Sequence, residues 1–136
     1  MTLEQQVCSL ELAKRLKELG VKQESHFVWH REGSLASVEL NDEKNYPLGV
    51  ERCAAFTVAE LGGMLPAEIN IPFKNGKPRA VNNSLKAYFG VGRSEVHLYY
   101  AKPAGTNEYV HMKGASEADA RAMMLIYLLE NKLITL

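Results

Sequence analysis

The chain has 136 residues, and its 16 basic and 16 acidic side chains cancel to a formal net charge of zero. Hydrophobic residues make up 46% and charged residues 24% of the sequence, which are ordinary globular values. These figures exclude disorder and a disulfide scaffold, and they predict a single domain over residues 1–136 that folds without metal, cofactor or disulfide. Because the net charge is zero, the protein has no overall electrostatic attraction to nucleic acid or to a membrane surface.

Cysteine use and the N-terminal segment predict the compartment. Cys8 and Cys53 lie far apart and form no C-x-x-C pair, a pattern typical of free thiols in a reducing compartment. Residues 1–19 carry three glutamates among their leucines, unlike a signal peptide. The longest apolar run, residues 122–129, is too short to cross a bilayer. We therefore expect a soluble, cytoplasmic protein with no membrane partner.

The first predicted element is an amphipathic helix that ends before Gly20. Two starts compete: Thr2 with Gln5 fits a capping box, and Ser9 is an alternative cap. Leucines spaced four and three residues apart form an apolar stripe, with charged residues on the other side. Gly20 stands where a Schellman ending needs a left-handed residue, and Val21 would follow as its apolar contact.

A strand is predicted over residues 26–31. Phe27 and Trp29 share one face, which we expect to lie in the core, while His26 and His30 share the other. Residues 36–40 predict an antiparallel partner for this strand. The sequence from there to residue 53 is too interrupted by turn residues to predict another element.

A second capping box, Thr57 with Glu60, predicts a short helix that begins at Val58 and is soon ended by glycines and a proline. Residues 69–73 are apolar, but Pro72 limits them to an edge strand or a loop.

Three further strands, over residues 87–91, 96–101 and 109–112, predict an antiparallel meander with two chemically different faces. The apolar face carries Val96, Leu98, Tyr100, Val110 and Met112, and the opposite face carries His97, Tyr99, Tyr109 and His111.

A last helix is capped by Ser116 and runs to about residue 130. The order of elements predicts an α+β fold: an antiparallel sheet of about 4–5 strands with an N-terminal helix, a short middle helix and a buried C-terminal helix.

The C-terminal helix is apolar nearly all round, which is typical of a helix buried on more than one side. Ala122, Leu125, Ile126 and Leu129 form one stripe, and Met124 and Leu128 lie on a second face. We favour a central helix within the monomer. The alternative is that Met124 and Leu128 meet a second subunit of a homodimer.

Motifs for metal binding and catalysis are weak. His26 and His30 form an H-x3-H pair, but on a strand they would lie roughly 13 Å apart, too far for one ion. The sequence has no G-x-S-x-G, C-x-x-C, H-E-x-x-H or P-loop motif. We therefore expect no metal site and no enzymatic activity. A catalytic pocket on the histidine and tyrosine face of the meander is a weaker alternative to a solvated sheet face.

The charges are distributed unevenly along the chain. Residues 1–68 carry a net charge of −4 and residues 95–136 a net charge of −1, whereas residues 69–94 hold five bases and no acid. These bases are Lys74, Lys77, Arg79, Lys86 and Arg93. Amides and aromatics are interleaved with them, a composition that nucleic-acid surfaces use. We favour the simpler alternative, in which the basic stretch neutralises the acidic N-terminal half.

Three segments of the chain resemble a group of small uncharacterised proteins of bacteriophages and prophages. They are CSLELAKRLKELGVKQES at 8–25, followed by an aromatic strand, TVAELGGMLP at 57–66 and EADARAMMLIYLLENKLI at 117–134. The resemblance implies a phage or prophage origin in a bacterial host cell. It carries no activity, cofactor or site residue.

The lack of catalytic motifs and the apolar C-terminal helix favour a non-enzymatic accessory protein that binds an unidentified protein partner or itself. The alternative is a nucleic-acid-binding module that uses the basic stretch 74–93. A mobility-shift titration at two salt concentrations separates the two hypotheses, because only nucleic-acid binding weakens steeply with salt.

Overall fold

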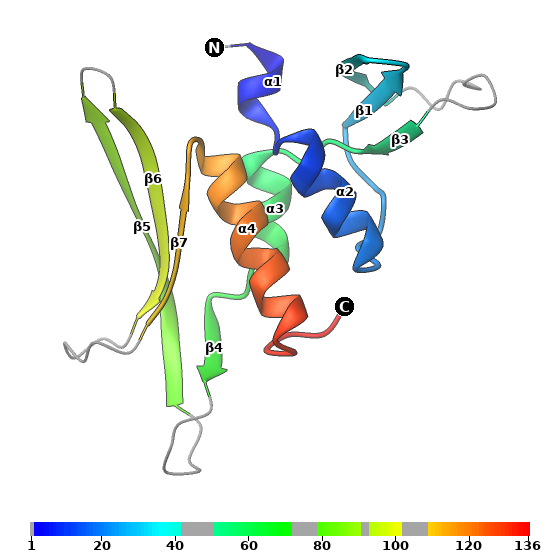
Figure 1. Ribbon diagram of the computed structural model, residues 1–136. Helices are drawn as coiled ribbons and strands as arrows, with labels where there is room; N and C mark the ends of the chain where they lie inside the picture. Colours follow the sequence, from blue (N-terminus) through cyan, green and yellow to red (C-terminus); the bar gives the residue numbers. More distant parts are fainter. Residues whose placement is uncertain (1, 42–50, 72–78, 91–92, 102–108) are drawn as a thin grey trace.

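The computed structural model describes residues 2–41, 51–71, 79–90, 93–101 and 109–136 of the chain (Figure 1), and side chains within 2–41, 51–69, 95–100 and 110–136. Its helices and antiparallel sheets confirm the predicted α+β class. The described strands form two sheets, one of three strands in the order β2-β1-β3 and one of four in the order β4-β5-β6-β7, where the sequence predicted a single sheet.

The helices are α1 (Leu3–Gln6), α2 (Leu10–Glu18), α3 (Val58–Met64) and α4 (Glu117–Glu130). The strands are β1 (Phe27–Glu32), β2 (Leu35–Leu40), β3 (Glu51–Ala54), β4 (Glu68–Ile71), β5 (Arg79–Gly90), β6 (Arg93–Ala101) and β7 (Tyr109–Gly114). Among these described elements, no helix has both the length and the apolar character that a bilayer crossing requires.

Both predicted starts of the N-terminal helix are used, because the segment is two helices. In α1 the backbone N–H of Thr2 donates to Gln5 Oε1 over 2.9 Å. The chain then extends at buried Val7, and α2 begins after Ser9. The end of α2 confirms the Schellman motif: Gly20 has φ +88°, and the N–H of Val21 donates to the carbonyl of Leu16 over 3.0 Å.

In the three-stranded sheet, β1 lies between β2 and β3. Trp29 pairs with Val38 on one side and Cys53 on the other. Trp29 is buried, as predicted, and so is Val28 on the opposite face. Strand β3 was not predicted, because its four residues are too few to establish an alternating pattern beside a polar loop.

The four-stranded sheet packs its apolar face against α4, which lies between this sheet and α2 (Figure 1). Val96, Leu98, Tyr100 and Val110 are buried on that face, as the alternation predicted. One hydrophobic cluster contains these residues and also Trp29 of the other sheet. The helices α2 and α4 therefore link the two sheets through a shared core.

The predicted interface residues Met124 and Leu128 are fully buried within the single chain. Helix α4 contacts β6 and β7 on one side and α2 and α3 on the other, so both of its apolar faces are covered. The prediction that Met124 and Leu128 meet a second subunit is therefore wrong. The alternative of a central helix explains why this helix is apolar nearly all round.

Candidate nucleic-acid interface

The structure places three of the five bases of the basic stretch in the four-stranded sheet. Lys74 and Lys77 lie outside the described residues. Arg79 and Lys86 belong to β5, and Arg93 opens β6. Because β5 pairs antiparallel with β6, Lys86 lies opposite His97 in the register. The described bases of this segment therefore belong to the same sheet as the histidine and tyrosine residues that follow it.

Three rings meet on the face of this sheet that points away from α4. His97 and Tyr99 come from β6 and His111 from β7; we call these three residues the ring cluster. The ring centroid of His111 lies 4.9 Å from that of His97 and 4.9 Å from that of Tyr99. The interplanar angles are 6° and 17°. Strand alternation puts these rings opposite the buried Leu98 and Tyr100.

Polar contacts join the ring cluster to two charged neighbours. His97 Nδ1 lies 2.7 Å from His111 Nε2, and His97 Nε2 lies 3.3 Å from Glu95 Oε2. Lys113 Nζ is 2.9 Å from Glu95 Oε1. The carboxylate of Glu95 is therefore shared between an ammonium and an imidazole, and its negative charge is compensated within the cluster.

The pKa of His111 is lowered below its usual value. Partial desolvation of the ring, which remains exposed overall, is the main cause, and the neighbouring His97 and Lys113 add to it. The neutral form of His111 is therefore favoured at neutral pH. A neutral imidazole has one unprotonated ring nitrogen that can accept a hydrogen bond, and a hydrogen bond between two imidazoles requires such an acceptor.

The ring cluster remains open to solvent. His111 and Lys113 are exposed, and Tyr99 is half-buried. The side chain of His97 is more enclosed, at 15% of its full exposure. The sheet thus presents three adjoining rings and a lysine on one face and its apolar side chains to α4 on the other.

No group of three or more histidine, cysteine, aspartate and glutamate side chains is arranged to hold a metal ion, as far as the described residues extend. His30 instead contacts Ser37 and Glu39, at 2.8 and 3.4 Å.

Burial raises the pKa of the Cys8 thiol to about 12 and raises the pKa of the Cys53 thiol as well. Both thiols therefore stay protonated at neutral pH, the form that is a poor nucleophile.

Sequence reasoning identified the face that holds the ring cluster but did not predict its contacts. Alternation alone put His97, Tyr99 and His111 together. The missing information was the register between β6 and β7, which pairs Tyr99 with His111 and so brings the three rings together. Tyr109, predicted on the same face, has a side chain outside the described set.

Comparison with models of known protein families, with curated proteins and with solved structures gives no match for this chain.

Proposed function

We propose that this protein, of the phage or prophage type that its sequence resembles, binds single-stranded nucleic acid without catalysis in the cytoplasm of a bacterial host cell. The binding surface is the ring-cluster face of the four-stranded sheet together with the basic strand β5. The observation that carries the proposal is the register that puts Lys86 beside His97, in a sheet whose next strand supplies His111 and Lys113.

Stacking is the first contribution to binding. Solvent-accessible aromatic rings stack with unpaired bases, and each such contact is worth about 1–3 kcal/mol. The exposed His111 and the half-buried Tyr99 supply such rings. A base within a duplex keeps its faces stacked on its neighbours, so this mode of contact favours a single strand.

Charge is the second contribution. Residues 69–94 carry five bases and no acid, and the part of this segment in β5 adjoins the ring cluster. Lys113 adds a cation on the other side of His97, which it faces in the register. The acidic Glu95 lies within 3.3 Å of both His97 and Lys113, so its repulsion of phosphate is reduced.

Burial of α4 is the reason to prefer this function over the protein-binding one. The apolar face of α4, which the protein-binding hypothesis required to be exposed, is internal, because Met124 and Leu128 are fully buried.

A separate observation favours protein binding at another surface: the edge strand β2 exposes 78% of Leu35 and 66% of Leu40. Exposed leucines on an edge strand suit contact with a partner strand. This second candidate function predicts that Leu35→Lys abolishes capture of a partner.

Fluorescence anisotropy with a labelled oligothymidine of about 20 nucleotides, a length that covers more than one typical binding site, tests the proposal. We expect binding at low salt that weakens as salt rises, and weaker binding to a duplex of equal length. Replacing Lys86 and Lys113 by serine should flatten the log–log salt slope by about 0.7 for each phosphate that is no longer bound. Tyr99→Leu should weaken binding without changing the slope, because it removes stacking and no charge.

Lys22→Ser is the matched control, because Lys22 is exposed and pairs with Glu24 over 2.8 Å, away from the four-stranded sheet. It should leave both affinity and slope unchanged. Absence of binding at low salt, or an equal effect of Lys22→Ser and Lys113→Ser, would contradict the proposal.

A further inference from the structure

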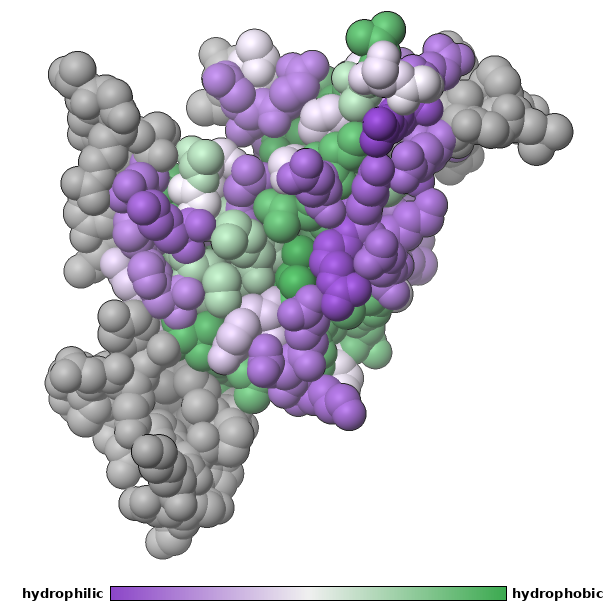
Figure 2. Space-filling view, viewed as in Figure 1, coloured by the Kyte–Doolittle hydropathy of each residue, from purple (hydrophilic) through white to green (hydrophobic). Residues whose placement is uncertain are grey.

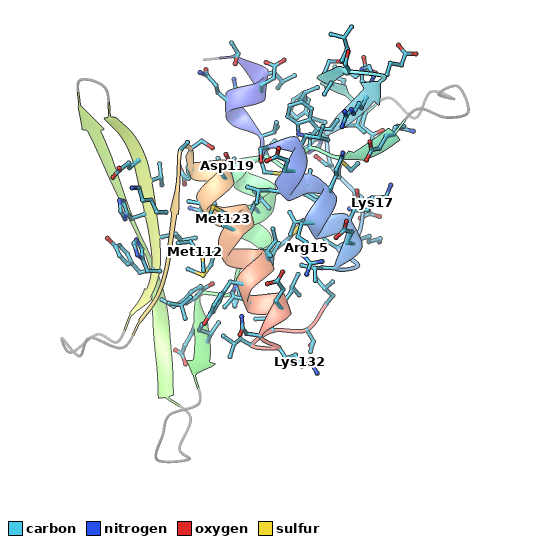
Figure 3. All side chains as sticks on the ribbon, viewed as in Figure 1. Arg15, Lys17, Met112, Asp119, Met123 and Lys132 are labelled. Atoms are coloured by element: carbon cyan, nitrogen blue, oxygen red, sulfur yellow. The ribbon has the colours of Figure 1, made fainter. Side chains whose placement is uncertain are left out.

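A concave region lies between α2 and β3, on the opposite side of the helices from the ring cluster. It consists of two hollows of about 340 and 300 Å³ that share Lys17, Arg52 and Cys53. We call it the α2–β3 cleft. Figure 3 shows Lys17 on the side of α2 that faces away from α4, whereas Arg15 lies toward α4 and pairs with Glu130. The ring cluster is on a different sheet, so the cleft is a separate site.

The rim of the α2–β3 cleft carries three bases and two acids. Figure 2 shows hydrophilic side chains gathered over α2. Lys14 and Lys17 come from α2 and Arg52 from β3, while the two acids on the rim, Glu18 and Glu51, are held by other bases. Glu51 pairs with Lys14 over 3.1 Å, and Glu18 pairs with Arg15 over 3.1 Å.

Lys17 is the cation best placed to receive a ligand. Its Nζ donates to the backbone carbonyl of Arg52 over 2.8 Å, which fixes its position and leaves two N–H donors for another acceptor. Within the part of the chain that the structure describes, Lys17 forms no ion pair with a carboxylate. The charge of Lys17 is thus held at the rim without being neutralised there.

The floor of the cleft is apolar. Val28, Cys53 and Ala54 line it and are at most 4% exposed. A cavity with an apolar floor and a few fixed polar groups is the usual form of a small-molecule site, and its volume is at the lower end of the usual range.

Two amide side chains make the walls rigid. Gln23 Oε1 accepts from the N–H of Ala54 over 2.8 Å. Asn41 Oδ1 accepts from Arg52 Nη2 over 3.2 Å, and Asn41 Nδ2 donates to the carbonyl of Ser25 over 3.2 Å. Because these side chains are already ordered, a ligand loses little affinity to ordering them.

We propose that the α2–β3 cleft binds a small phosphate monoester with an apolar body. Its phosphate group contacts the ammonium of Lys17 and the guanidinium of Arg52 at the rim. Its apolar body lies over Val28 and Ala54, which pair with each other across β1 and β3. Lysine and arginine are the side chains that proteins use most for phosphate, and charge-assisted hydrogen bonds to them are about twice as strong as neutral ones.

Titration of the ¹⁵N-labelled protein with phenyl phosphate, followed by amide chemical shifts, tests this site. We expect saturable shifts of the amides of Arg52, Cys53 and Ala54, with a dissociation constant of about 1 mM or below. Phenyl phosphate should bind more tightly than inorganic phosphate, because only the phenyl ester covers the apolar floor. Phenol should bind more weakly than phenyl phosphate, because it lacks the anion.

Lys17→Gln should weaken phenyl phosphate binding at least about tenfold, since it removes one charge-assisted hydrogen bond, and Lys17→Arg should retain binding within about threefold, since the charge is kept. Lys22→Gln, also at an exposed lysine, should change nothing. An unperturbed amide spectrum elsewhere verifies that each variant is folded.

Absence of saturable shifts, unchanged affinity in Lys17→Gln, or equal affinity for inorganic and phenyl phosphate would overturn the proposal. Oligonucleotide binding at the ring cluster should persist with the cleft saturated, so failure of one site is distinguishable from failure of the other.

Discussion

The indole N–H of Trp29 donates a hydrogen bond to the backbone carbonyl of Cys8 over 2.8 Å, inside the core. Trp29 belongs to β1, and Cys8 lies in the extended residues between α1 and α2. The N–H of Cys8 in turn donates to the carbonyl of Phe56 over 3.0 Å, just before α3. The buried backbone of Cys8 therefore connects the three-stranded sheet to α1, α2 and α3.

Replacing Trp29 tests this connection. Trp29→Phe keeps an aromatic ring but leaves the Cys8 carbonyl without its donor, so we expect a loss of about 1–3 kcal/mol in the free energy of unfolding. Trp29→Ala should cost more, about 3–5 kcal/mol, because it also creates a cavity. Urea denaturation followed by circular dichroism measures both. A loss below about 0.5 kcal/mol in Trp29→Phe, the usual size of surface effects, would show that the hydrogen bond contributes nothing.

The sequence predicted an element well where the pattern that specifies it lies within a few consecutive residues. The Schellman ending at Gly20, the caps at Thr57 and Ser116, and the alternation of Val96, Leu98 and Tyr100 are of this kind. Each depends on one residue's backbone conformation or on one strand's own side chains, so no distant contact is needed to establish it.

Long-range contacts account for what the sequence could not predict. The break between α1 and α2 occurs at Val7, which bridges Thr57, and the N–H of Ser9 donates to Asp119 Oδ1 over 2.8 Å. Neither partner is visible within a local window. The ring cluster and the α2–β3 cleft likewise depend on strand register and on the packing of α2 against β3, which only the folded chain brings about.

The junction between β7 and α4 leaves no space for a side chain at Gly114. A Cβ there would lie 2.5 Å from the backbone nitrogen of Ala120 and 2.9 Å from its Cα. Because the obstacle is helix backbone, we expect Gly114→Ala to destabilise by more than about 2 kcal/mol. Urea denaturation measures the change. A loss below about 0.5 kcal/mol, the usual size of surface effects, would mean that β7 and α4 can separate.

Gly63 is the matched control for this substitution. It lies in α3, is exposed, and a Cβ at this position would meet no heavy atom within 4 Å. Gly63→Ala should therefore stabilise the protein by about 0.5–1 kcal/mol, because alanine loses less backbone entropy in a helix than glycine. Opposite signs for the two glycine variants are the expected result.

The buried face of α4 gives a prediction about stability and oligomeric state. Leu128→Ala should cost about 2–5 kcal/mol, with the same denaturation midpoint at low and high protein concentration. Leu128→Glu should unfold the chain, because the charge would be buried without a partner. Leu136, which is 68% exposed, provides the control Leu136→Glu, with a change within about 0.5 kcal/mol. A folded Leu128→Glu monomer in sedimentation would instead place this face at an interface.

The two thiols should react slowly in the folded protein. At about pH 8, a pKa of about 12 for Cys8 leaves roughly one thiolate in ten thousand. Cys53 is only 4% exposed, and burial raises its pKa too. A thiol-specific aromatic disulfide reagent should therefore label neither cysteine rapidly until urea is added, with Cys53 the faster of the two. Rapid stoichiometric labelling without denaturant would contradict the burial of both residues.

The ring cluster should make stability depend on pH through His111. The pKa of His111 is lowered on folding by burial, by His97 and by Lys113, whereas in the unfolded chain it returns to about 6.5. Between these two values the unfolded chain binds a proton that the folded chain does not. The contribution of His111 is therefore fully present above the unfolded pKa and is lost as the pH falls below it.

Urea midpoints at about pH 7.5 and about pH 5.5, on either side of the ordinary histidine pKa, measure this effect. We expect the midpoint to fall on acidification in the native sequence and to fall less in His111→Gln, which cannot take up the proton. His26→Gln, at an exposed histidine outside the ring cluster, should retain the native dependence. If His111→Gln kept the full pH dependence, the proton uptake would not belong to His111.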